Sequence, residues 1–195
     1  PVVDGMIQVP SWRPDLRCMA DIAEEVARYY GYNRIETTLM RGATTLGGYT
    51  EAEALENKAC AIARSLGYSE IITYSFVSPT VFDNIRLPED TPLRNAIRII
   101  NPLGEDTSIM RTVILPSMLD ILARNYAYKN KGVKLYELGR IYLPVEGHDL
   151  PDEPKRLIFG TYGEHEDFFS MKGEIDALLA SLNIPTATYV RNTEN

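Results

Sequence analysis

Four acidic residues near the N-terminus are the strongest candidate for chemistry in this sequence: Asp15, Asp21, Glu24 and Glu25. Asp21 lies three residues before Glu24 and four before Glu25, so these three can share one face of a helix. Asp15 lies in the preceding turn and can swing toward the same place. Four converging carboxylates suit a hard divalent cation with oxygen ligands, Mg²⁺ in particular. The alternative is that the acids simply occupy a first helical turn, where the helix dipole favours them.

A second cluster combines aromatic and basic residues near the middle of the chain. Its members are Tyr126, Tyr128, Lys129, Lys131 and Lys134. Such residues can contact RNA by stacking and charge. The alternative, which we favour, is a solvated helix end whose cations complement the helix dipole.

No other motif in the sequence predicts a catalytic centre. His148 and His165 are isolated in predicted loops, with no nucleophile or zinc-ligand set near them in the sequence. The serines at 11, 75 and 117 lack a G-x-S-x-G context. There is no Walker-type loop and no G-x-G-x-x-G. The motifs therefore predict a chain without catalytic or nucleotide-binding residues of its own.

The composition of the chain excludes further classes of protein. The 195 residues carry a net charge of −7, which argues against a domain built to grip phosphates. Cys18 and Cys60 have no C-x-x-C spacing, so we expect buried apolar thiols in a reducing cytosol rather than a disulfide or a metal pair. No apolar run approaches the roughly 20 residues of a membrane span. A start at Pro1 and a polar stretch at 191–195 predict a piece of a longer protein.

The acidic residues must be positioned by a turn and a helix. Turn residues fill 11–15, and an apolar stripe at helical spacing predicts a helix over 19–30. Gly31 is a candidate left-handed cap that ends it. Residues 33–49 have no clear periodicity and are predicted as a linker. We place a domain boundary near Met40, with domains 1–40 and 41–195.

The second domain mixes helices and strands without a strict alternation. Thr50 and Glu53 have the spacing of a capping box at the start of a helix that Gly67 ends. Further helices are predicted over 116–130 and 168–182, and strands over 71–77, 95–100, 134–143 and 156–162. The last two strands are expected to pair antiparallel. The prediction is an α+β fold with an antiparallel sheet.

Five stretches, taken in order, resemble the β chain of bacterial phenylalanine–tRNA ligase. The most specific begins Asn101-Pro102-Leu103-Gly104 and continues through Leu115-Pro116. A helix, a strand and a proline over 66–79 resemble the first motif of class II synthetases. The other stretches are 9–33, 135–142 and 168–174.

The resemblance implies an (αβ)₂ heterotetramer whose α chain binds ATP and phenylalanine. It implies that residues 1–40 are the end of a small DNA-binding-like domain. It also implies that residues 41–195 are a class II-like core, truncated at its C-terminal end, that has lost catalysis. The sequence agrees, because no strand after Tyr142 carries an ATP-clamping arginine and glutamate. The expected role is structural: binding the α subunit, with weak or no tRNA binding by this region.

The resemblance also favours the metal interpretation of the acidic residues. The family's β chain holds a Mg²⁺, shared with the α chain, through an Asp followed six, nine and ten residues later by Asp, Glu and Glu. Asp15, Asp21, Glu24 and Glu25 match this pattern position for position. Two other functions stay open: a free-standing class II synthetase-like enzyme, and a helix–turn–helix-like nucleic-acid-binding module. The missing ATP clamp argues against the first and the negative charge against the second.

Overall fold

The computed structural model describes residues 2–185 and 187–191. The chain forms two compact units, residues 1–47 and 48–195. The division falls between Gly47 and Gly48, inside the stretch predicted as a linker. Residues 192–195, part of the polar stretch at the end of the sequence, lie outside the described residues.

The first unit is a small hairpin followed by one helix. Strands β1 (Val2–Val3) and β2 (Met6–Ile7) pair antiparallel. Helix α1 (Met19–Tyr30) has the predicted bounds and is followed by a short 3₁₀ turn, Tyr32–Arg34. Gly31 ends α1 with a φ of 100°, a conformation that glycine adopts without strain. None of the residues of α1, all of which are described, is buried.

The second unit is built on a three-stranded sheet in the order β3-β6-β7. Strands β6 (Val133–Arg140) and β7 (Lys155–Tyr162) pair antiparallel, as predicted. Strand β3 (Ser69–Glu70) pairs parallel to β6, in contrast to the antiparallel sheet predicted from the sequence. A parallel pair needs a long crossover connection, and residues 71–132 supply it.

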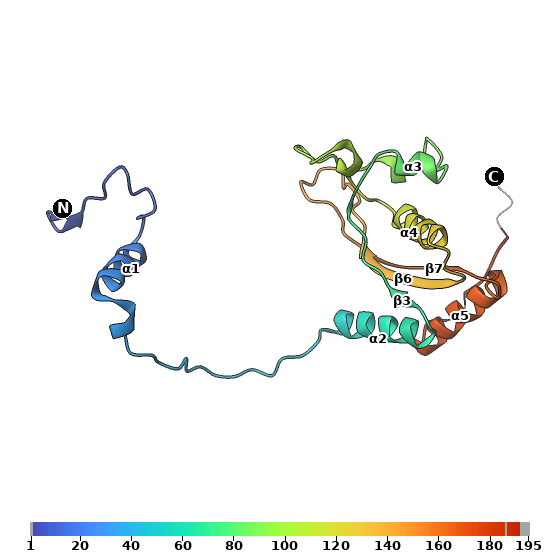
Figure 1. Ribbon diagram of the computed structural model, residues 1–195, viewed down its shortest axis with the longest axis horizontal. Coiled ribbons are helices and arrows are strands. Elements are labelled where there is room, and N and C mark those ends of the chain that lie inside the picture. Colours follow the sequence, from blue (N-terminus) through green and yellow to red (C-terminus); the bar gives the residue numbers. More distant parts are fainter. Residues whose placement is uncertain (1, 186, 192–195) are drawn as a thin grey trace. The chain divides into compact units, whose positions relative to one another are not determined.

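Helices cover both faces of this sheet (Figure 1). Helices α2 (Glu51–Ser65) and α5 (Phe168–Ser181) lie on one face, and α4 (Leu115–Ala127) lies on the other. Tyr136 and Ala63 are fully buried in the core between β6 and α2. Among the described residues, no helix combines the length and apolar character that crossing a bilayer requires.

Capping residues fix the starts of two of these helices. Thr50 accepts a hydrogen bond from the Glu53 backbone N–H at 3.3 Å, and the Glu53 carboxylate accepts one from the Thr50 N–H at 2.8 Å. The predicted capping box of α2 is therefore confirmed. Asp167 and Ser170 form an equivalent box at the start of α5.

The connection between β3 and α4 is less regular than predicted. It contains the strand pair β4 (Phe76–Val77) and β5 (Ile109–Met110), the short helix α3 (Val81–Asn84), and 3₁₀ turns at Pro92–Arg94 and Glu105–Thr107. Of the strand expected over 71–77, only Phe76–Val77 form a strand, while the Ile71 N–H separately donates to the Tyr136 carbonyl of β6 at 2.9 Å. The strand expected over 95–100 is reduced to a bridge between Arg98 and Ile109.

The two cysteines differ in environment. Both are free thiols, as expected. Cys60 is half-buried and packs against the core, whereas Cys18 is exposed at the start of α1. The expectation of a buried Cys18 is therefore wrong, because α1 has no buried side of its own in which to hold it.

Candidate functional site

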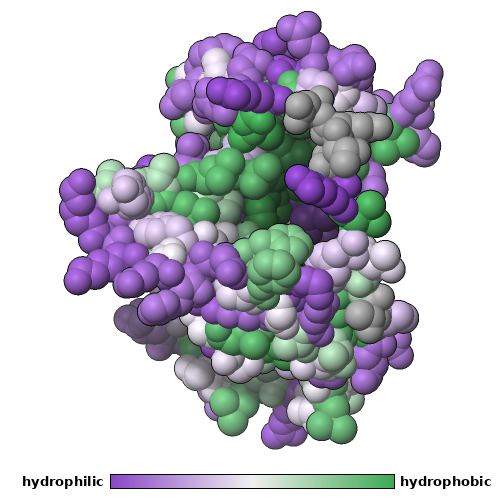
Figure 2. All heavy atoms as spheres, turned by 90° about the vertical axis from the view of Figure 1, so that its right-hand side faces the viewer, coloured by the Kyte–Doolittle hydropathy of each residue, from purple (hydrophilic) through white to green (hydrophobic). Residues whose placement is uncertain are grey.

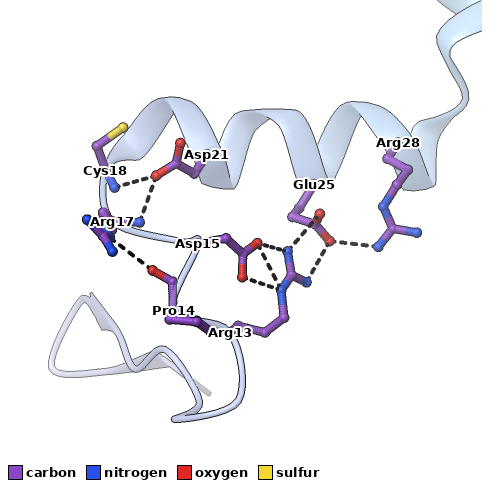
Figure 3. Close-up of polar contacts among 8 residues, drawn as sticks. All are labelled: Arg13, Pro14, Asp15, Arg17, Cys18, Asp21, Glu25 and Arg28. Atoms are coloured by element: carbon purple, nitrogen blue, oxygen red, sulfur yellow. Dashed lines mark hydrogen bonds and ion pairs between the residues drawn. The ribbon is translucent and has the colours of Figure 1, made fainter. Parts of the chain in front are cut away.

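Asp15 and Glu25 converge on a single guanidinium group, that of Arg13 (Figure 3). Arg13 Nη2 lies 2.6 Å from Asp15 Oδ2 and 3.0 Å from Glu25 Oε1. Arg13 Nε also donates to Asp15 Oδ1 at 3.0 Å, and Nη1 donates to Glu25 Oε2 at 3.2 Å. The turn before α1 is thus fastened to the middle of the helix by one cation and two carboxylates.

Asp21 lies apart from this pair and caps the helix. Its carboxylate accepts hydrogen bonds from the backbone N–H groups of Arg17 at 2.7 Å and Cys18 at 2.8 Å. These bonds lower the pKa of Asp21, because they stabilise its charged form. For this residue the structure matches the alternative interpretation, an acid in the first turn of a helix.

The remaining predicted ligand is Glu24, and Glu25 has a second ion pair besides the one with Arg13. Glu24 is exposed on α1. Glu25 also pairs with Arg28, three residues later on the helix, at 2.6 Å. Within the ranges that the structure describes, no three acidic, histidine or cysteine side chains are grouped closely enough to hold a metal ion. The chain therefore brings Asp15 and Glu25 together around Arg13 and leaves the four carboxylates unassembled.

The guanidinium groups change the acidity of both carboxylates. Hydrogen bonding from Arg13 lowers the pKa of Asp15. Hydrogen bonds from Arg13 and Arg28 together lower the pKa of Glu25 to about 2. Both carboxylates are thus ionised at neutral pH, as ligands of a hard cation must be.

Arg13 belongs to this site but is not among the residues predicted from the sequence. The signal was available, because an arginine two residues from Asp15 in a tight turn is within reach of it. The second partner of Arg13 could not be predicted from local spacing, because Glu25 lies twelve residues away in the sequence.

A second polar cluster lies inside the larger unit. The buried Arg111 and Glu137 form an ion pair at 2.9 Å. Thr73 Oγ1 accepts from Arg111 Nη1 and donates to a Glu137 carboxylate oxygen, both at 2.7 Å. Arg111 Nε donates to the Arg140 carbonyl at 2.8 Å. With this number of partners the pair is satisfied internally, which indicates a structural role.

The extended segment that contains Thr73 has two different sides. Burial alternates along residues 71–77, with odd positions partly covered and even positions exposed. Ile72 is 90% exposed, Tyr74 87% and Phe76 49%. Near them is an open, mainly apolar pocket of about 400 Å³ that Tyr74 and Phe76 line together with Leu103. Figure 2 shows hydrophobic side chains gathered in a hollow on the face that it turns toward the viewer.

The basic and aromatic cluster is partly used within the chain. Lys134 pairs with Glu174, lies 3.8 Å from Glu166, and sits over the Tyr68 ring at 4.8 Å. Tyr126 packs edge-on against Tyr162. These contacts favour the interpretation of a structural and solvated surface over an RNA-binding one.

Comparison with known proteins identifies the family. Residues 35–195 match the family described as phenylalanyl tRNA synthetase beta chain CLM domain, and residues 4–32 match the tRNA synthetase B5 domain. The structure is similar to two structures of pyrrolysyl tRNA synthetase from Desulfitobacterium hafniense. Their TM-scores are 0.53 and 0.54, with 14% and 17% identity, over 69% and 68% of this chain and 46% and 47% of theirs. This likeness supports a synthetase-like α+β fold.

Curated relatives agree with the family match. The phenylalanine–tRNA ligase beta subunit of Clostridium tetani is 43% identical over 97% of this chain, and that of Clostridium acetobutylicum is 42% identical over 95%. In both cases the match covers 24% of the relative, so this chain spans about a quarter of their length. The chain belongs to the phenylalanyl tRNA synthetase beta chain family.

Proposed function

We propose that this chain is the part of a phenylalanine–tRNA ligase β subunit that binds the catalytic α subunit and has no catalytic activity itself. In this proposal residues 41–195 are a non-catalytic class II-like core, and residues 1–40 are the end of a small DNA-binding-like domain. The whole enzyme, an (αβ)₂ heterotetramer, attaches phenylalanine to its tRNA with ATP. The free-standing enzyme and the nucleic-acid-binding module remain the less favoured alternatives.

The observation that supports the proposal most is the exposed apolar row Ile72, Tyr74 and Phe76. Successive side chains of an extended segment point to opposite sides, so these three share one side. The opposite side is fixed to the protein, because Thr73 bonds Glu137 and the Ser75 carbonyl accepts from the Arg111 backbone N–H. An ordered segment with an unused apolar side is typical of a protein–protein interface.

The simpler alternative is that this apolar row packs only on its own sheet. The exposures argue against it, since Leu103 beside the same pocket is also fully exposed. Aromatic residues are enriched at interfaces, and Tyr74 and Phe76 supply two. The row therefore has apolar area left over after the chain has filled its own core.

The test is assembly with the α chain. The unmodified chain and a Tyr74→Glu variant are mixed with purified α chain, and complex formation is followed by sedimentation velocity. We expect a complex with the unmodified chain and a large loss of it with Tyr74→Glu. Leu150→Glu, a control at an exposed apolar residue in the loop 144–154, should leave assembly intact. Equal assembly by both variants would place the interface elsewhere.

The proposal includes a Mg²⁺ shared between the subunits, with Asp15, Asp21, Glu24 and Glu25 as its ligands from this chain. The chemistry of these donors suits Mg²⁺, which prefers carboxylate oxygens and keeps several waters. Their arrangement in the chain alone does not fit, because Arg13 occupies the space between Asp15 and Glu25. The metal site must therefore be completed by a rearrangement on this side and by groups from the α chain.

Two further parts of the proposal concern setting. We propose a cytoplasmic location, which is supported by two free thiols that suit a reducing compartment. We also propose at most weak tRNA binding by this region, because its net charge is −7 and Lys134 is paired within the chain. Contacts with tRNA in the intact enzyme would then come mainly from other parts of it.

A further inference from the structure

We propose that Arg13 is an internal substitute for the divalent cation, and that its guanidinium must leave Asp15 and Glu25 before a metal can bind there. This inference rests on the magnesium part of the proposed function. It concerns what the chain does before the metal arrives. The disagreement between the donor set and its arrangement is its starting point.

The contacts of Arg13 support a bridging role. Its Nε and Nη2 face Asp15, and its Nη1 and Nη2 face Glu25, so all three nitrogens of the guanidinium have carboxylate partners. The side chain is 25% exposed, and that of Glu25 is 24% exposed. Arg13 thus holds the two carboxylates together, as a metal ion would if both were its ligands (Figure 3).

The charges of the cluster also support the inference that Arg13 takes the place of a cation. Asp15 and Glu25 contribute two negative charges, and Arg13 and Arg28 contribute two positive ones, with Arg28 on the outer side of Glu25. A metal approaching this group meets no net negative charge. Coulomb attraction for a dication is therefore weak until one arginine moves.

Arg13 is placed to move without unfolding the helix. It lies in the turn before α1, where its backbone N–H bonds the Pro10 carbonyl and its own carbonyl accepts from Leu16. The start of the helix is held separately by Asp21 and the backbone of Arg17 and Cys18. Release of the guanidinium thus costs side-chain contacts and leaves the cap of α1 in place.

Arg17 provides a matched control within the same turn. Its Nε donates to the Pro14 carbonyl at 3.0 Å, and no bond from its side chain to a carboxylate is present among the described residues. Arg17→Gln and Arg13→Gln each remove one positive charge from the turn. Only Arg13→Gln also frees two carboxylates. A difference in Mg²⁺ affinity between the two variants therefore reports the guanidinium held between Asp15 and Glu25, rather than the general loss of one positive charge.

The experiment measures Mg²⁺ binding to the whole chain by calorimetry, without α chain, with helix content checked by circular dichroism. We expect Arg13→Gln to bind Mg²⁺ about tenfold more tightly than the unmodified chain, and Arg17→Gln no more than about twofold. Arg13→Lys, which keeps the charge but not the planar fork, should lie between. A loss of helix content in Arg13→Gln would overturn the inference, because Arg13 would then be needed to hold α1 and could not leave its carboxylates.

The opposite results are equally clear. Equal affinities for the unmodified chain and both Arg13 variants, or no Mg²⁺ binding by any of them, would overturn the substitution by Arg13. The proposed function is judged separately, by metal analysis of the α–β complex. Mg²⁺ that is present in the unmodified complex and lost with Asp21→Asn and Glu24→Gln keeps the shared site even if Arg13 is not the substitute. A complex without Mg²⁺ removes the shared site itself.

Discussion

Arg111 and Glu137 lie 2.9 Å apart in the interior, and each side chain is 3% exposed. Arg111 precedes α4 in the chain, and Glu137 is in β6, so the pair joins a loop to the centre of the sheet. Thr73 adds the extended segment to the same group. Three segments distant in the sequence therefore depend on one buried charge pair.

Removing one charge of this pair should be costly. Glu137→Gln leaves the buried Arg111 without a counter-charge, so we expect the free energy of unfolding to fall by about 3–5 kcal/mol. Urea denaturation measures it. Glu153→Gln breaks an exposed pair with Arg140 and should cost less than about 1 kcal/mol. A small effect at Glu137 would mean that the pair is not closed to water.

Gly139 should tolerate no side chain. An added Cβ would overlap the Arg111 guanidinium and lie 2.8 Å from Glu137 Oε1. We expect Gly139→Ala to lower the free energy of unfolding by about 1–3 kcal/mol, as overpacking does. Gly173→Ala is the matched control, since nothing lies within 4 Å of its Cβ position in α5, and it should stabilise the helix slightly. Thermal unfolding of both variants compares them.

The ionisation of Glu25 should report the Arg13 contact. Its pKa is about 2 in the folded chain against an ordinary value of 4.5. A lowered pKa stabilises the fold above pH 4.5, and this stabilisation is lost as the pH falls toward 2. We expect a carboxyl titration of Glu25, followed by NMR, with its midpoint near 2. Arg13→Gln should move the midpoint upward; an unchanged midpoint would show that Arg28 alone sets it.

Binding to tRNA should be weak and sensitive to salt. Lys129 and Lys131 can neutralise few phosphates, and Lys134 is held by Glu174. We expect the logarithm of the binding constant to fall against the logarithm of salt concentration with a slope no steeper than about three. Filter binding over a salt series measures it. Tight binding that persists at high salt would contradict the assignment of tRNA contacts to other regions.

The chain alone should be inactive in both steps of aminoacylation. Its sequence lacks the ATP-clamping arginine and glutamate expected after Tyr142. We expect no phenylalanine-dependent pyrophosphate exchange and no charging of tRNA from a preparation without α chain. Exchange above background would favour the free-standing enzyme instead.

The helices could be predicted because their information is local. The stripe of α1 and the glycine after it gave the observed bounds, and Thr50 with Glu53 fixed the start of α2. The antiparallel pair β6–β7 also followed from two adjacent strand patterns. Each of these features depends on residues a few positions apart.

The remaining features depend on partners far away in the sequence. The strand predicted over 71–77 is interrupted because Thr73 bonds the Glu137 side chain instead of a neighbouring strand. The candidate metal site shows the same limit. The spacing of Asp21 and Glu25 correctly predicted that both lie on α1. The hydrogen-bond partners of each carboxylate could not be predicted in this way, because they depend on the conformation of the turn that carries Arg13.

The apolar row on residues 71–77 has a consequence for how the chain must be made. Ile72, Tyr74 and Phe76 lie on an extended segment whose outer side is available to any other apolar surface. Exposed apolar strands promote aggregation when no proper partner covers them. Synthesis together with the α chain should therefore raise the soluble yield, and a chain produced by itself should self-associate as its concentration increases. The row that we propose to bind the α chain is therefore also expected to make the isolated chain prone to aggregation.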